Sequence, residues 1–362
     1  MKKRSGNLDL MKFLFSVMIV IYHGKNLATG GPILFPGGSA AVEFFFLVSG
    51  VLMARTASKT EIQGNLGKDT LAFVKHKISG LMPNYYVAFV IAFIVSHLGA
   101  TSLFLLFKDA IYSVWELLLV TGVGLRPIDG LANGAVWYLS AMLLAMFVIW
   151  PIMRKCKDLF FYWIAPIAVL LIMGITYQNW TRFGAPSLWT GVCFRGTIRA
   201  FMGILLGCIA YKVAEFIKRQ EFTLLSKSIF SLVELVGYIT VFVICMVRHR
   251  GTTDWAIVAI LAVCVTITFS DVTIWADRFR HPAFNRLGVF SYSLYLGHGY
   301  WSNALADLLP KLTYWQRMPI YLLISFATGL FIHFVSIGLR RLWAAKGTQI
   351  KRMFISGREK SL

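Results

Sequence analysis

Ionisable side chains inside long apolar stretches are the first candidates for chemistry in this sequence. Placing such a group within a bilayer is costly, so each one suggests a functional site unless a partner explains it. The five Cys form no CxxC pair and lie apart, and we expect no metal site. The embedded ionisable residues are Lys12, His23, Glu43, Arg195, Arg199, Glu234, His298 and His333.

Lys12 and His23 lie eleven residues apart in the first apolar run. Eleven helical steps of about 100° place both side chains on one face, about 16 Å apart along the helix axis. A neutral histidine at the outer end of such a helix could act as a general base. The alternative is that Lys12 extends to the inner interface and His23 is a packing residue.

Glu43 begins the second apolar run, at the depth expected for His23. Its carboxylate could have a catalytic role by orienting the imidazole of His23, or it could form an ion pair with Lys25 or Arg199. Arg195 and Arg199 are four residues apart and therefore share a helix face. These two cations could bind an anionic or sugar substrate, or they could neutralise Glu43 and lipid phosphates.

Two further residues are candidates for contact with a substrate. His298 ends the segment FSYSLYLGH within a late apolar run and either packs inside the bundle or lines a pore. Trp137 lies in the segment VWYLSAML, near the end of a run, where the aromatic belt of a membrane protein also explains it. Glu234 and His333 have no motif around them, and we interpret them as structural.

Long hydrophobic helices must position these residues. The chain has 362 residues, 57% hydrophobic and 14% charged, which excludes an ordinary soluble domain. We therefore predict an all-α polytopic membrane helical bundle. Apolar runs long enough to cross a bilayer occur at 10–28, 38–55, 81–98, 103–122, 134–151, 159–177, 194–211, 229–247, 254–272, 287–306 and 319–339.

The distribution of Lys and Arg selects among topologies. With the N-terminus inside and 103–122 excluded, most of the 36 Lys and Arg fall in inner loops, as is usual for membrane proteins. If 103–122 also crossed the membrane, the basic clusters at 154–157, 212–227 and 340–360 would become external. We predict ten transmembrane helices and one interfacial helix at 103–122. The net charge of +20 then needs no nucleic acid partner.

Five segments resemble a known family when they are taken in order. They are LDLMKFLFSVMIVIYH, EFFFLVSGVL, KHKISGLMPNYY, VWYLSAML and SYSLYLGH. Together they resemble the acyltransferase 3 family of integral membrane acyltransferases, over nearly the whole chain. The resemblance implies transfer of an acyl group, commonly acetyl, from cytoplasmic acyl-CoA to a hydroxyl of an extracytoplasmic glycan or polysaccharide.

The resemblance also implies roles for two residues of the first run. The family carries a basic residue, then ten residues, then an essential histidine, a pattern that Lys12 and His23 match. Lys12 would contact the acyl-CoA donor, although arginine is common there and lysine lacks its bidentate phosphate recognition. Lys75 and Lys77 are further candidate contacts for the phosphates of acetyl-CoA or another acyl-CoA.

Two other classes of function stay open at the level of sequence. The bundle could be a secondary transporter, although no half-repeat or Walker motif is visible, or it could be a non-catalytic scaffold of envelope polysaccharide assembly. We expect a transmembrane domain at 1–345 and a basic cytoplasmic tail at 346–362. We place the protein in the lipid of a bacterial inner membrane, with both termini cytoplasmic.

Overall fold

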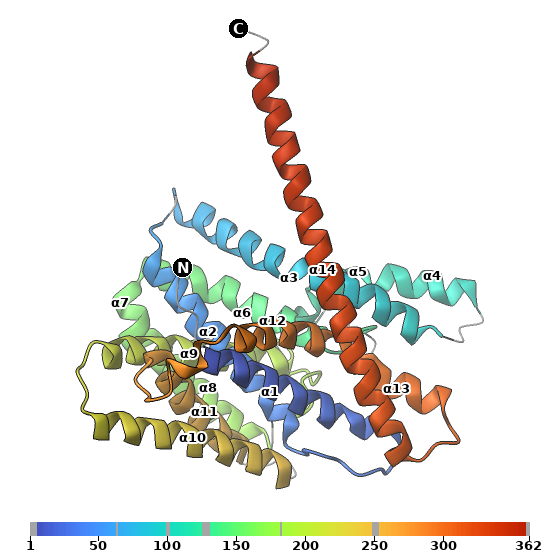
Figure 1. The fold of residues 1–362 in the computed structure, drawn as a ribbon, viewed down its shortest axis with the longest axis horizontal. Helices are drawn as coiled ribbons and strands as arrows, with labels where there is room; N and C mark the ends of the chain where they lie inside the picture. The colour runs from blue at the N-terminus through green and yellow to red at the C-terminus, as the bar shows by residue number, and fades with distance from the viewer. Residues whose placement is uncertain are drawn as a thin grey trace.

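A computed structural model describes residues 6–62, 64–98, 102–124, 131–181, 183–247 and 253–359, with side chains described up to 343. These residues form an all-α bundle without β-strands, as predicted (Figure 1). The helices are α1 Gly6–His23, α2 Ala41–Lys59, α3 Leu66–Ser96, α4 Leu103–Tyr112, α5 Val114–Leu117, α6 Val136–Lys155, α7 Lys157–Leu159, α8 Ala165–Asn179, α9 Arg195–Lys218, α10 Leu224–Val247, α11 Thr253–Ser270, α12 Pro282–Gly297, α13 Gly299–Leu308 and α14 Tyr314–Glu359. Short helical turns η1 Gly24–Leu27 and η2 Gly38–Ala40 join α1 to α2.

Nine helical stretches in the described chain are long and apolar enough to cross a membrane, and each overlaps most of one of the ten predicted runs. The tenth run, 287–306, is divided into α12 and α13, which meet at His298. Gly297 and Gly299 flank the break, and glycine is a poor helix former. The side chain of His298 also bonds the carbonyl oxygen of Tyr295, which satisfies a backbone group at the end of α12.

The run at 103–122 does not cross the bundle. It forms α4, of ten residues, and the single turn α5. At about 1.5 Å per residue, α4 is too short to span a bilayer. Leu103 is 84% exposed and Phe104 is 74% exposed. This arrangement agrees with the predicted surface helix.

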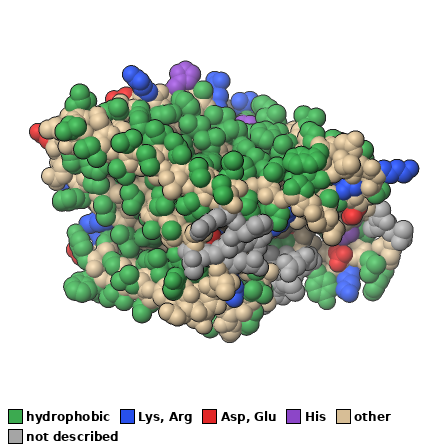
Figure 2. Space-filling view, turned by 90° about the horizontal axis from the view of Figure 1, so that it is seen from below, with side chains coloured by type: hydrophobic (Ala, Val, Ile, Leu, Met, Phe, Trp, Pro, Cys, Tyr) green, Lys and Arg blue, Asp and Glu red, His purple; other side chains and the backbone are tan. Residues whose placement is uncertain are grey.

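The chain alternates between two ends of the bundle. The connections that follow α2, α6, α9 and α11 lie toward the left of Figure 1, whereas the ends of α1, α3 and α13 lie toward the right. These four connections, all predicted to be inner loops, therefore lie toward one end of the bundle. Figure 2 shows a broad hydrophobic face with charged side chains mostly near its edges, as expected for a surface that contacts lipid. The protein is a multi-pass membrane protein.

Close packing of two helix pairs brings the candidate residues together. α1 packs along α12, and α2 packs along α9. The second pair relies on glycine, because a Cβ atom at Gly50 would lie 2.1 Å from the carbonyl oxygen of Ile204, and one at Gly207 would lie 2.1 Å from that of Leu47. Small residues of this kind let membrane helices approach closely.

The C-terminal helix α14 extends beyond the rest of the bundle (Figure 1). The predicted boundary at 345 falls inside this helix. Side chains of the predicted tail, 346–362, lie outside the described residues, so the division into domain and tail stays a prediction.

Candidate active site

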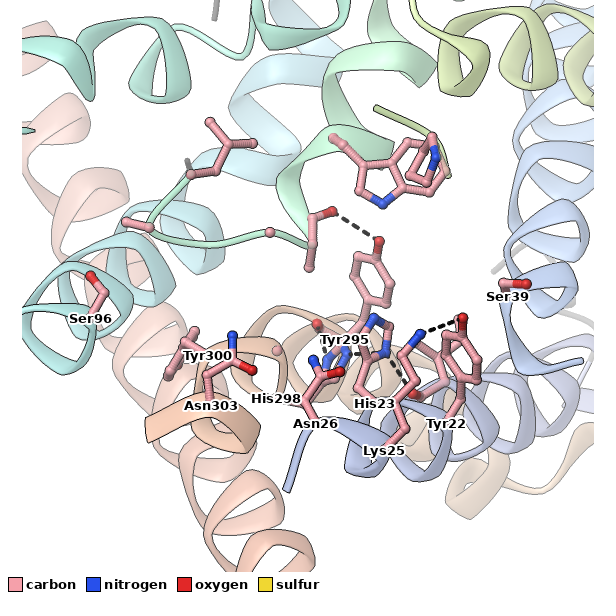
Figure 3. Close-up of a pocket in the computed structure, with 18 of the residues that line it drawn as sticks. Tyr22, His23, Lys25, Asn26, Ser39, Ser96, Tyr295, His298, Tyr300 and Asn303 are labelled. Carbon is pink, nitrogen blue, oxygen red and sulfur yellow. Dashed lines mark hydrogen bonds between the residues drawn. The ribbon is translucent and has the colours of Figure 1, made fainter. Parts of the chain in front are cut away.

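A cavity of about 880 Å³ lies where α1, α3 and α12 end. Its walls come from the segment after α1, the end of α3, the 131–135 segment, the 184–187 segment and α13. Figure 3 shows His23 and His298 side by side in this cavity, with Tyr295 above them in that view. The predicted residues His23, Arg199, His298 and Trp137 all line the cavity.

The two histidines contact each other at the ends of their helices. Nδ1 of His23 lies 3.2 Å from Nε2 of His298, and the ring centroids are 4.9 Å apart. Nδ1 of His23 also lies 2.9 Å from the carbonyl oxygen of Ile19, and Nδ1 of His298 lies 2.6 Å from that of Tyr295. His298 is 1% exposed, so its ring is held firmly by its surroundings.

These contacts assign the protons on both rings. A carbonyl oxygen only accepts hydrogen bonds, so Nδ1 of His298 donates to Tyr295 and Nδ1 of His23 donates to Ile19. In neutral His298, Nε2 then carries a lone pair and shares the single Nδ1 proton of His23 with the carbonyl oxygen of Ile19. Neutral His23 is therefore left with a lone pair on Nε2. A histidine in this tautomer can accept a proton from a bound hydroxyl group.

A buried carboxylate fixes the wall opposite the histidines. Glu116 is fully buried, and its two carboxylate oxygens accept from the backbone N–H groups of Ala132 and Asn133, at 3.0 and 2.9 Å. Nδ2 of Asn133 donates to the carbonyl oxygen of Leu296, at 3.0 Å. The 131–135 segment is thus tied to the end of α12, where His298 follows. Nothing in the sequence around Glu116 indicated this role, because it depends on contacts between distant segments.

Glu43 contacts Arg199 rather than His23. Nε of Arg199 donates to Oε1 of Glu43 at 2.6 Å, and both side chains are at most 1% exposed. Glu43 does not line the cavity. Of the two roles open for Glu43 in the sequence, the structure shows the ion pair, because α2 and α9 pack together and face it with Arg199.

Arg199 connects this ion pair to a second cavity wall. Its NH1 group donates to the carbonyl oxygen of Phe183 at 2.6 Å, and its guanidinium carbon lies 5.3 Å from the ring centre of Trp137. The N–H of Phe183 donates to the buried carboxylate of Asp254 at 2.7 Å. Two charged groups therefore hold the start of the 183–187 segment. Arg195 does not line the cavity, and its guanidinium lies 5.0 Å from the ring of Trp180 instead.

The cations proposed for the donor lie away from the cavity. The cavity reaches back along α1 to Ile19, and Lys12 is not part of its lining. Nζ of Lys12 lies 3.2 Å from Oδ1 of Asp9. Lys77 lies over the ring of Phe73 and close enough to Lys12 for their charges to interact, while Lys75 is exposed on α3.

The two residues interpreted as structural have packing and hydrogen-bonding partners. Glu234 accepts hydrogen bonds from the side chains of Asn7, Thr268 and Trp275. The ring of His333 packs edge-on against Phe290. Neither residue lines the cavity.

Comparison with known proteins identifies the family. No curated protein and no solved structure matches the chain. A family model described as an acyltransferase domain, that of acyltransferase 3, matches residues 5–337 and so covers nearly the whole chain. The paired histidines lie inside this match and line a cavity between membrane helices. The chain therefore belongs to the acyltransferase 3 family and is a membrane acyltransferase.

Proposed function

We propose that this protein is an acyl-CoA-dependent O-acyltransferase that moves an acyl group, in the simplest case acetyl, to a hydroxyl of a glycan or polysaccharide. The observation that carries the proposal is the pair of contacts made by Nδ1 of His23, which leaves Nε2 with its lone pair at the cavity. A base in this position matches the requirement of a hydroxyl nucleophile.

The proposed reaction needs one base and one attack. Nε2 of His23 takes the proton of the acceptor hydroxyl as its oxygen attacks the thioester carbonyl carbon. The C–S bond then breaks, CoA leaves as a thiolate, and the proton on His23 neutralises that thiolate. The products are the acyl ester and CoA, and His23 returns to its starting state. General base catalysis of this kind contributes about 10² to 10⁴ in rate.

The donor would approach from the end of the bundle opposite to the cavity. Lys12 is about 16 Å from His23 along α1, by helix geometry. Its charge, with those of Lys77 and Lys75 on α3, would attract the phosphates of CoA, and the pantetheine arm would extend along α1 toward His23. This arrangement supports a cytoplasmic location for that end and for both termini, in a bacterial inner membrane, with the acceptor on the outer side.

Substrate-binding roles divide among the predicted residues. Trp137 lines the cavity and would contact the bound substrates there. Arg199 also lines the cavity, but it is 1% exposed and paired with Glu43, so it would support the wall, whereas Arg195 is set back against Trp180. His298 contacts His23 directly, so we assign it to the orientation of the base.

The test is transfer across a sealed membrane. Purified protein in proteoliposomes receives radiolabelled acetyl-CoA on one side and a panel of glycans on the other. We expect label in the glycan with wild type and with His333→Ala, a matched histidine variant outside the cavity, and none with His23→Ala. Accumulation of unmodified glycan inside the vesicles without label would indicate a transporter. Release of CoA and labelling of glycan by His23→Ala at the wild-type rate would contradict the proposal.

A further inference from the structure

Tyr300, near the start of α13, has a buried hydroxyl group with no function in the fold. The residue is 7% exposed, and its ring packs against Ala92 and Val95 of α3 and against Ala132. Its hydroxyl oxygen is buried and has no hydrogen-bond partner among the described residues. Phenylalanine would fill the same apolar cluster without burying an unpaired oxygen. A buried polar group without a partner calls for an explanation, and a bound ligand is one.

Tyr300 belongs to the wall of the cavity. Tyr300, Asn303 and Asp307 all line it, and Figure 3 shows Tyr300 and Asn303 together on the side of the histidines where α13 lies. Their spacing of three and four residues places them along one face of α13. From Tyr300 to Asp307 this face extends over about 10 Å, leading away from His298.

The chemistry of this face differs from that of the rest of the cavity. Asp307 is the only acidic residue in the cavity lining of the described chain, and the lining cations Lys25 and Arg199 come from other elements. A carboxylate repels the phosphates of CoA, so the α13 face is unsuited to the donor. A tyrosine hydroxyl and an amide both donate and accept hydrogen bonds, and a carboxylate accepts several.

We propose that the face of α13 formed by Tyr300, Asn303 and Asp307 is a subsite that binds an uncharged polyhydroxylated acceptor through hydroxyls next to the one that reacts. The inference rests on the proposed function for the identity of the reacting hydroxyl, but binding itself does not require catalysis. Neighbouring hydroxyls both donate and accept, and they match this set of side chains. The acceptor would enter along α13 and present its reacting hydroxyl to His23 at the inner end of the face.

The experiment measures binding without turnover. Protein in nanodiscs free of glycoside detergents is titrated with methyl glycosides that present all arrangements of vicinal hydroxyls, and with deoxy analogues lacking one of them. Binding is followed by saturation-transfer difference NMR. The variants are Tyr300→Phe, Asn303→Ala and Asp307→Asn. The matched control is Tyr314→Phe, because Tyr314 is 6% exposed and does not line the cavity.

We expect at least one methyl glycoside to bind to wild type and to Tyr314→Phe. Its Kd should rise about 3- to 10-fold in Tyr300→Phe, which loses one hydrogen bond, and about 10-fold or more in Asp307→Asn, which loses a charged acceptor. Unchanged Kd values in all three variants, or no binding of any glycoside to wild type, would overturn the subsite. Binding that follows this pattern in a protein that transfers no acyl group would retain the subsite and refute the proposed function.

Discussion

Replacing His298 by Ala should slow the acyl transfer step without weakening substrate binding. In wild type, Nδ1 of His23 donates to His298 and to Ile19, at 3.2 and 2.9 Å. When His23 gains the proton of the acceptor, both hydrogen bonds become charge-assisted. Such a bond contributes about 1.5–3 kcal/mol. The neutral bond already contributes about 0.5–1.5 kcal/mol, so only the gain of about 1–1.5 kcal/mol acts on kcat. Loss of the bond to His298 should therefore lower kcat about 5- to 12-fold. Ile19 still holds the tautomer, so the loss should be smaller than that of His23→Ala.

The assay is steady-state transfer from acetyl-CoA to glycan, with kcat and KM determined separately. His298→Gln keeps an acceptor for Nδ1 of His23 and should retain more activity than His298→Ala. Added imidazole should partly restore His298→Ala, because the cavity left by the ring can hold it, and it should not affect the control His333→Ala. A rise in acceptor KM with unchanged kcat would refute this reasoning, because it would show His298 to be a substrate contact instead.

Three further substitutions test the surroundings of the histidine pair. Glu43→Gln leaves the charge of Arg199 buried and unpaired, so we expect a loss of about 3–5 kcal/mol in stability. The Tm should fall, while the kcat of the molecules that stay folded should equal that of wild type. A fall in kcat at wild-type Tm would instead make Glu43 part of the catalytic machinery. The amide in Glu116→Gln can accept a hydrogen bond from only one of the backbone N–H groups of Ala132 and Asn133, so the KM for the acceptor should rise about 10-fold. An unchanged KM would show that the 131–135 segment does not need this carboxylate. Lys12→Ala should raise the acetyl-CoA KM about 10-fold while Lys12→Arg keeps it near wild type; equal KM values in both variants would exclude a phosphate contact.

The helical architecture could be predicted from sequence because it depends on composition along the chain. Apolar runs of bilayer length predicted the nine helices of the described residues that can cross a membrane, and the charge distribution predicted that 103–122 is not a transmembrane helix. The break at His298 was not predicted, although its run carries His298 between two glycines and is less apolar than the others. It depends on two flanking glycines and on a side chain that satisfies a freed carbonyl group, a contact that a hydropathy profile does not include.

The candidate site was predictable only where a single helix determines it. Lys12 and His23 belong to one helix, so their spacing fixed their common face. The contact between His23 and His298 joins residues 275 positions apart, and it follows from the packing of α1 on α12. The partner of Glu43 depended in the same way on the packing of α2 on α9. Tertiary contacts of this kind leave no periodic signal in the sequence.

The most direct test of the central claim is a single-turnover measurement on His23→Gln. Protein in proteoliposomes is saturated with radiolabelled acetyl-CoA and mixed with glycan, and the rate constant of ester formation is followed by rapid quench. If Nε2 of His23 is the base, the rate constant should fall about 10²- to 10⁴-fold while the affinity for acetyl-CoA is unchanged. A rate constant within a few-fold of wild type, with the same donor affinity, would contradict the account.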